Sequence, residues 1–123
     1  MSTPGKSMTP EAFLPLTPAT FQILLALVGE ERHGYAIMRE VETRSEGAVR
    51  LGPGTLYGSL KRLLEQGLVA ESDERAYPAM GDERRRYYRL TPLGLAVARA
   101  EARRLEAMVR AARRKRLIGV QAS

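Results

Sequence analysis

Residues 54–69 of this chain read GTLYGSLKRLLEQGLV, and this stretch decides the fold. Its leucines recur at intervals of three and four residues, which is typical of the buried face of an amphipathic helix. The helix is expected to begin near Pro53 and to end at Gly67, where a strand follows directly. The opposite face carries hydroxyls and cations but no acid, and its members are Thr55, Tyr57, Ser59, Lys61 and Arg62.

The composition bounds the class of protein. The chain has 123 residues, 44% of them hydrophobic, and a formal net charge of +6. This length suits one domain with its own core, and the positive balance favours a nucleic-acid partner. The absence of cysteine excludes disulfides and thiolate metal sites. No apolar run can span a bilayer and no secretory signal is present, so we expect a cytoplasmic protein with no membrane partner.

Two more helices are expected before residue 53. The first runs from about Pro18 to Val28, because Thr17 can cap it and proline fits the first helical position. The second runs from about Gly34 to Arg44. Their expected buried residues are Phe21, Leu24, Leu25 and Val28 in the first, and Tyr35, Met38 and Val41 in the second. Three short helices joined by tight links form a helix-turn-helix pattern.

Two strands are expected after the third helix, over residues 68–72 and 86–90, because both are rich in β-branched or aromatic side chains. The polar link 73–85 joins them into a hairpin with a long tip, the wing. Tyr87 and Tyr88 alternate across the second strand, so one should be buried and the other exposed.

The cations and hydroxyls of the third helix and the wing predict a DNA-binding surface. Arginine on a hairpin tip can enter a minor groove or bind a phosphate, because its charge is permanent and its donors are forked. Tyr57 has two open interpretations, as a DNA contact or as a core or interface residue whose hydroxyl reaches the surface. The predicted DNA-binding residues are Thr55, Tyr57, Ser59, Lys61, Arg62, Arg84, Arg85 and Arg86.

A long last helix is expected from Pro92 to about Arg116, with Thr91 as its cap. One apolar stripe, which includes Val97, can face the helix's own domain. A second stripe alternates by three and four residues like a heptad seam, and such a seam on a projecting helix favours the same helix of a second copy as its partner. The predicted dimer interface is Leu95, Ala98, Ala102, Leu105, Val109 and Ala112.

The predicted fold is therefore mainly α with a small β-hairpin. It is a winged helix-turn-helix with a long C-terminal dimerisation helix. We expect four divisions: a mobile N-terminal arm with a short helical turn over 1–15, the DNA-binding domain over 16–91, the dimerisation helix over 92–117 and a tail over 118–123.

Catalytic signals are absent from the sequence. There is no Cys–His pair, and the glycines around Pro53 lack the lysine of a nucleotide-binding loop. His33 is the single histidine, so it is expected to be a link residue and not a metal ligand. We therefore expect no enzyme activity, no catalytic residue, no metal and no cofactor.

Four segments resemble one known family in order and spacing. They are HGYAI at 33–37, GTLYGSLKRL at 54–63, GLV at 67–69 and RYYRLTPLG at 86–94. Together they resemble the PadR-like transcriptional regulators. The resemblance implies a dimeric winged helix-turn-helix repressor with the third helix and wing on operator DNA. It also implies DNA-facing roles for Thr55, Tyr57, Ser59 and Lys61 in the helix, and for Arg85 and Arg86 in the wing.

The predicted function is a homodimeric repressor on a palindromic site in double-stranded DNA. Relief by a small-molecule inducer between the paired last helices stays open, although the chain has no tryptophan to stack one as some relatives do. The alternative from another class is a winged-helix protein–protein adaptor without DNA binding. The cationic wing argues against the adaptor, and the lack of an aromatic stacking platform argues against an RNA-binding protein.

Overall fold

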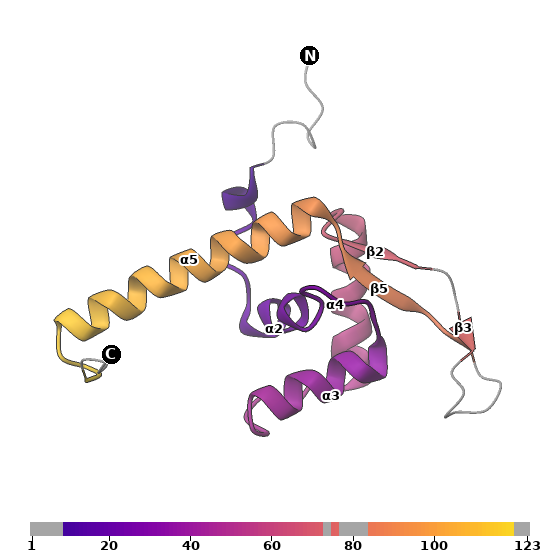
Figure 1. Cartoon of the computed structure of the whole chain (residues 1–123), viewed down its shortest axis with the longest axis horizontal. Helices are drawn as coiled ribbons and strands as arrows, with labels where there is room; N and C mark the ends of the chain where they lie inside the picture. Colours follow the sequence, from indigo (N-terminus) through magenta and orange to yellow (C-terminus); the bar gives the residue numbers. More distant parts are fainter. Residues whose placement is uncertain (1–8, 73–74, 77–83, 120–123) are drawn as a thin grey trace, which may run out of the picture.

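The computed structural model describes residues 9–72, 75–76 and 84–119, with the backbone alone for 75–76 and 84–85. Figure 1 shows helices packed beside a small sheet, with one long helix crossing them. The elements in chain order are η1 (Pro10–Phe13), α2 (Pro18–Ala26), β1 (Arg32–His33), α3 (Gly34–Arg44), α4 (Pro53–Glu65), β2 (Val69–Glu71), β3 (Arg75–Ala76), β4 (Arg84–Arg85), β5 (Tyr87–Leu90) and α5 (Pro92–Arg114).

The core lies between the helices and one face of the sheet. α4 contributes the leucines that its periodicity predicted, and β2 follows its end directly, as expected. The largest fully buried apolar side chains are Ile23, Leu24, Leu27, Ile37, Val41, Leu56, Leu60, Leu63, Leu68 and Val97. These residues come from α2, α3, α4, α5 and the turns beside them, so the described elements share one core.

The buried face of α2 differs from the expected one. Ile23, Leu24 and Leu27 are buried, whereas Val28 is 48% exposed and follows the helix, which already ends at Ala26. Of the expected stripe, Leu24 is buried as predicted and Phe21 and Leu25 are half-buried, so the prediction is wrong at Val28. α2 is apolar around most of its circumference. Periodicity cannot select a face on such a helix.

The sheet has three antiparallel strands in the order β1-β5-β2. β2 and β5 form the predicted hairpin, and β3 and β4 pair further along the same hairpin. β1 lies at the other edge, with His33 opposite Tyr87. The sequence assigned this segment to a polar link, because a two-residue strand is too short to show alternation. Tyr88 is buried and Tyr87 only half-buried, so the two tyrosines do face different environments.

The first turn of α5 packs tightly on the turn between α4 and β2. Thr91 Oγ1 accepts from the Gly94 N–H at 2.9 Å, which confirms the predicted cap, and donates to the Gly67 carbonyl at 2.6 Å. A Cβ on Gly94 would overlap the Leu68 carbonyl. Only glycine allows this approach, so it fixes how α5 leaves the sheet.

The residues before α2 do not form a free arm. The predicted turn is present as η1, and Phe13, Leu14 and Leu16 pack against the core. The short helical turn expected in this arm is therefore confirmed, and Phe13 and Leu14 after it lie against the core; residues 1–8 lie outside the described residues.

Glu101 links this N-terminal segment to α5. Its side chain is 2% exposed and accepts two hydrogen bonds from Arg104, at 2.7 and 2.8 Å. The Arg104 guanidinium, aided by a hydrogen bond from the Leu16 backbone, lowers the pKa of the Glu101 carboxyl despite burial.

We expect Glu101→Gln to lower the free energy of unfolding at pH 7 by about 1–3 kcal/mol, because a charged acceptor is lost. The folded-state pKa lies below the ordinary one. The ionised Glu101 carboxylate therefore contributes its full stabilisation to the folded state above the ordinary pKa of 4.5. This stabilisation is lost as the pH falls through the folded-state pKa. Chemical denaturation between pH 7 and pH 3 should show a flatter acid dependence in the variant. Glu106→Gln, on the exposed side of the same helix, is the matched control; an equal effect of both substitutions would contradict this role.

Candidate nucleic-acid interface

α4 presents one face to solvent along its whole length. Thr55, Lys61 and Arg62 are exposed, and the Tyr57 side chain is 46% exposed. The buried leucines hold the opposite face in the core, so this orientation is fixed by packing. The face is a row of donors and positive charge, with Glu65 as the acid at its far end.

Ser59 does not belong to this face. It is 3% exposed, and its Oγ accepts from Arg62 Nη2 at 3.3 Å. The prediction of a DNA-facing hydroxyl at Ser59 is therefore wrong. The residue lies next to the leucine stripe around the helix, and serine is small enough to be buried there. Its hydroxyl instead orients the guanidinium of Arg62.

The N-terminus of α4 is open to an anion. Its N-cap residue is Gly52, which has no side chain to cap the first N–H groups, and Pro53 follows. The first turn holds no acid. Free N–H groups and the helix dipole together favour a phosphate at such an end.

Two of the sequence motifs meet in space. Gly34 begins α3, and a Cβ there would overlap the hydroxyl and ring of Tyr57 on α4. Gly34 therefore provides the space for Tyr57. The Tyr57 ring packs on the start of α3 while almost half of the residue stays exposed, so its role as a DNA contact stays a prediction. No periodic signal marks this role of Gly34.

The start of α3 supports the same surface. His33 Nδ1 accepts from the Ala36 N–H at 3.2 Å and caps the helix, so the residue is a cap as well as a link. Tyr35 is exposed, which corrects its predicted place in the buried stripe, and the Arg39 guanidinium lies 5.8 Å from its ring centroid. Tyr35, Arg39 and Arg50 border a hollow beside the start of α4. Arg39 and Arg50 were not among the predicted site residues, and only the one-turn spacing of Tyr35 and Arg39 could have indicated Arg39.

The wing is described in part. Arg84 and Arg85 form β4, but their side chains lie outside the described residues. Arg86 is exposed and its Nη1 lies 3.2 Å from the Glu71 carboxylate across the hairpin. Burial raises the pKa of the Tyr88 phenol, and the Glu71 carboxylate and Tyr57 raise it further, while Arg86 lowers it.

The predicted seam of α5 is divided between its own core and solvent. Ala98 is buried in the core of its own chain, so its predicted place in a dimer interface is wrong. Ala98 lies on α5 between the two predicted apolar stripes, and its own domain covers it. Leu95, Leu105 and Ala112 are half-buried, while Ala102 and Val109 are exposed.

The arrangement of a helix-turn-helix, a paired wing and a long C-terminal helix defines a winged helix-turn-helix protein. Residues 23–100 match the family described as the transcriptional regulator PadR-like family. The chain belongs to this family of transcriptional regulators, as its motifs predicted.

Relatives and solved structures agree with this membership. The transcriptional regulator Rv3488 of Mycobacterium tuberculosis is 36% identical over 88 residues, which cover 72% of this chain and 76% of that protein. The structure of H. salinarum RosR is 31% identical with a TM-score of 0.59, covering 85% of this chain and 89% of that one. A PadR family regulator from Clostridium difficile R20291 shares the fold at 22% identity and a TM-score of 0.64. The match covers 77% of this chain and 94% of that one.

Two other relatives are covered less completely. The match covers 22% of a 37.1 kDa protein in a Streptomyces fradiae transposon and 65% of protein X from Lysinibacillus sphaericus. Among the described residues, no three His, Asp or Glu side chains gather as a metal site. None of the described helices is both long and apolar enough to cross a membrane.

We expect Tyr57 to determine whether the substitution Gly34→Ala destabilises or stabilises the protein. Gly34→Ala should destabilise the protein by about 1–3 kcal/mol, because the new methyl displaces the tyrosine ring. In a Tyr57→Ala background the same change should be neutral or should stabilise by up to about 1 kcal/mol, because alanine favours the helix over glycine. Chemical denaturation of the four proteins measures this coupling, and equal effects in both backgrounds would contradict the contact.

Proposed function

We propose that this chain is a homodimeric, sequence-specific DNA-binding repressor. α4 enters the major groove of double-stranded DNA, and the wing lies on the adjacent backbone. The observation that carries the proposal is the exposed face of α4, where Thr55, Lys61 and Arg62 follow an open helix N-terminus without an acid. The net charge of +6 supports an anionic partner.

Each element has a separate role in this proposal. Lys61 and Arg62 bind phosphates that flank the groove, which positions the protein without reading sequence. Thr55 and Tyr57, near the start of the helix, contact base edges or the first phosphate. The wing arginines Arg84, Arg85 and Arg86 contact backbone or minor groove.

The proposed operator is an inverted repeat. A two-fold dimer presents two α4 helices, and its half-sites lie about one helical turn apart. Occupying this site blocks a promoter. A small molecule that changes the angle between the two subunits would release the DNA.

We expect Lys61→Ala and Arg62→Ala each to weaken binding to operator and generic duplexes alike. Each substitution removes one phosphate contact from each of the two subunits. The slope of log affinity against log salt concentration should therefore become shallower by about two. Fluorescence anisotropy with a labelled duplex at several salt concentrations measures this slope. Arg103→Ala, an equal charge change on the exposed part of α5, is the control.

Two results would refute the DNA proposal. One is wild-type binding that is absent or does not change with salt, which favours a protein–protein adaptor. The other is an equal loss of DNA affinity in the Arg103→Ala control, which would mean that net charge alone, and no specific contact of α4, causes the effect.

We expect Leu105→Asp to convert the dimer into monomers, because it places a charge in the apolar seam. Ala107→Asp introduces the same charge on the opposite side of α5 and should leave the dimer intact. Sedimentation equilibrium at micromolar concentration measures both. A dimer that persists in Leu105→Asp would exclude α5 as the interface.

A further inference from the structure

Lysine is rare in this chain, and one lysine lies on the face of α4 that we propose to contact DNA. Of the 20 basic residues, lysine supplies Lys6, Lys61 and Lys115, and arginine supplies the others. Lys61 is exposed, and within the described part of the chain no hydrogen bond or ion pair holds its ammonium group. The two basic side chains differ in chemistry, because a lysine amine can be acylated whereas a guanidinium stays protonated.

The turn before Lys61 leaves space for a small anion. Gly58 lies three residues before Lys61 and four before Arg62, so both cations lie on its side of the helix. Helical side chains lean toward the N-terminus, which directs both cations toward Gly58. A Cβ added to Gly58 would lie 3.9 Å from Arg62 Nη1 and close to no other side chain. We call this open position, bounded by Gly58, Lys61 and Arg62, the Gly58 seat.

Ser59 holds Arg62 in position beside this seat. Its buried Oγ accepts a hydrogen bond from Arg62 Nη2 at 3.3 Å. The guanidinium therefore lies back along the preceding turn, with Nη1 near Gly58. A guanidinium has five N–H donors, and the bond to Ser59 uses one of them. The remaining donors are available to the oxygens of a phosphate group.

We propose that Lys61 is acylated by acyl phosphates that bind in the Gly58 seat, and that this modification weakens DNA binding. Arg62 binds the phosphate group of the reagent, which places the acyl carbon beside the Lys61 amine. The unprotonated amine attacks that carbon. A C–N bond forms as the C–O bond to phosphate breaks, inorganic phosphate leaves, and the amine proton passes to water.

The modification acts on DNA binding through charge. The product is a neutral amide, so each subunit loses the proposed phosphate contact of Lys61. This part of the inference rests on the DNA-binding function proposed above. Arg62 and the wing arginines cannot undergo the same reaction, because their guanidinium groups stay protonated. Among the predicted DNA contacts, the reaction is therefore confined to Lys61.

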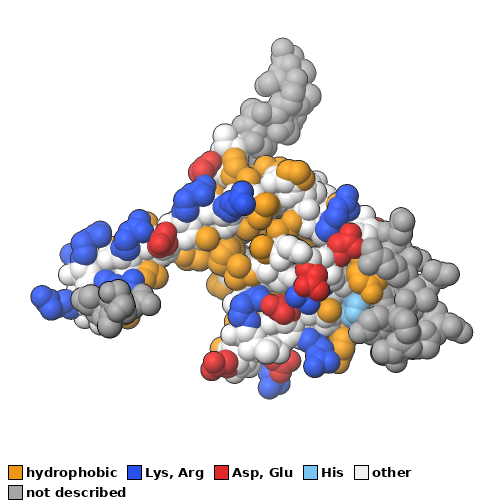
Figure 2. Space-filling model, viewed as in Figure 1, with side chains coloured by type: hydrophobic (Ala, Val, Ile, Leu, Met, Phe, Trp, Pro, Cys, Tyr) orange, Lys and Arg blue, Asp and Glu red, His pale blue; other side chains and the backbone are white. Residues whose placement is uncertain are grey.

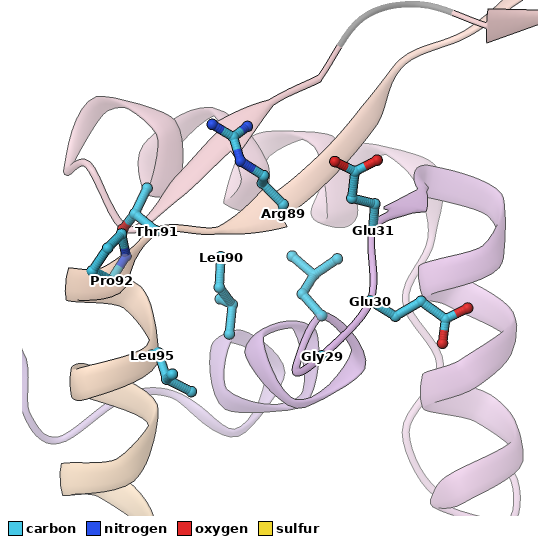
Figure 3. A pocket seen from close by; sticks show the side chains of 9 residues that line it. Gly29, Glu30, Glu31, Arg89, Leu90, Thr91, Pro92 and Leu95 are labelled. Atoms are coloured by element: carbon cyan, nitrogen blue, oxygen red, sulfur yellow. The ribbon is translucent and has the colours of Figure 1, made fainter.

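Two other parts of the surface fit an anionic reagent less well. A hollow of about 490 Å³ at the start of α5 is bordered by Glu30 and Glu31, whose carboxylates repel an anion (Figure 3). Lys115 directly follows α5, where Figure 2 shows Lys and Arg side chains gathered. These cations attract acyl phosphate, but Ala111 and Ala112 precede Lys115 by one turn, so no glycine leaves a seat there. Lys115 therefore separates the effect of the seat from that of general positive charge.

Acetyl phosphate tests the seat directly. The protein is treated with acetyl phosphate or with the uncharged reagent N-hydroxysuccinimide acetate, and mass spectrometry of its peptides measures acetylation at Lys61 and Lys115. The uncharged reagent corrects for exposure. We expect acetyl phosphate to raise the ratio of Lys61 to Lys115 modification at least roughly fivefold over the uncharged reagent. Arg62→Ala should abolish this preference, whereas Arg103→Ala on α5 should keep it. Equal ratios with the two reagents, or a preference that survives Arg62→Ala, overturn the proposal.

Fluorescence anisotropy with a labelled duplex tests the effect on DNA. Treated wild type, and Lys61→Gln as a mimic of the neutral amide, should bind roughly tenfold to hundredfold more weakly than untreated wild type. Lys61→Arg keeps the charge and cannot be acylated, so treatment should leave its affinity unchanged. Lys115→Arg is the matched control and should lose affinity on treatment as the wild type does.

The outcomes separate this inference from the function on which it rests. An equal loss of affinity in treated Lys61→Arg would overturn the role of Lys61. Salt-dependent DNA binding by the untreated protein together with unselective acetylation overturns the inference while the proposed function stands. Untreated protein that does not bind DNA overturns both the proposed function and the effect of the modification.

Discussion

The close approach between the first turn of α5 and the turn after α4 fixes the geometry of this protein. Gly94 faces the Leu68 carbonyl with no room for a side chain, and Thr91 bonds both its own helix and Gly67. These contacts involve backbone atoms, which cannot move aside as a side chain can. The direction of α5 is therefore fixed relative to α4, and the proposed dimerisation surface is fixed relative to the proposed surface for DNA.

This coupling gives the proposed repressor a physical route for regulation. Because α4 and α5 are joined through a tight turn, a change in the angle between two α5 helices would move the two α4 helices as rigid extensions. The distance between proposed half-sites would change accordingly. Glu101 adds a second constraint, since it ties the segment before α2 to the middle of α5.

The residues of the family motifs contact one another and hold one another in position. Gly34 provides the space for Tyr57, His33 caps the helix that Gly34 begins, and Tyr87 packs edge-on against His33 at 5.5 Å. The proposed interface is thus assembled from α3, α4 and the sheet together. A substitution at a glycine or histidine here would change the surface without itself touching a ligand.

Four incorrect sequence predictions share one cause. The sequence predicted Val28 and Tyr35 as core, Ser59 as surface and Ala98 as interface. Each residue lies on a helix or helix end where apolar and polar positions adjoin, so a small rotation changes which neighbours are buried. Packing against several elements determines that rotation, and no local pattern records it.

The sequence by itself determined the order of the helices and of the hairpin, the bounds of α3, the start of α4, the helix caps at Thr17 and Thr91, and the family. Those features depend on local spacing and on residues a few positions apart. Only the tertiary structure decided the contact between Tyr57 and Gly34, the strand at Arg32, the burial of Ser59 and the exposure of Val28. These depend on contacts between segments far apart in the chain, and such contacts exist only once the core has formed.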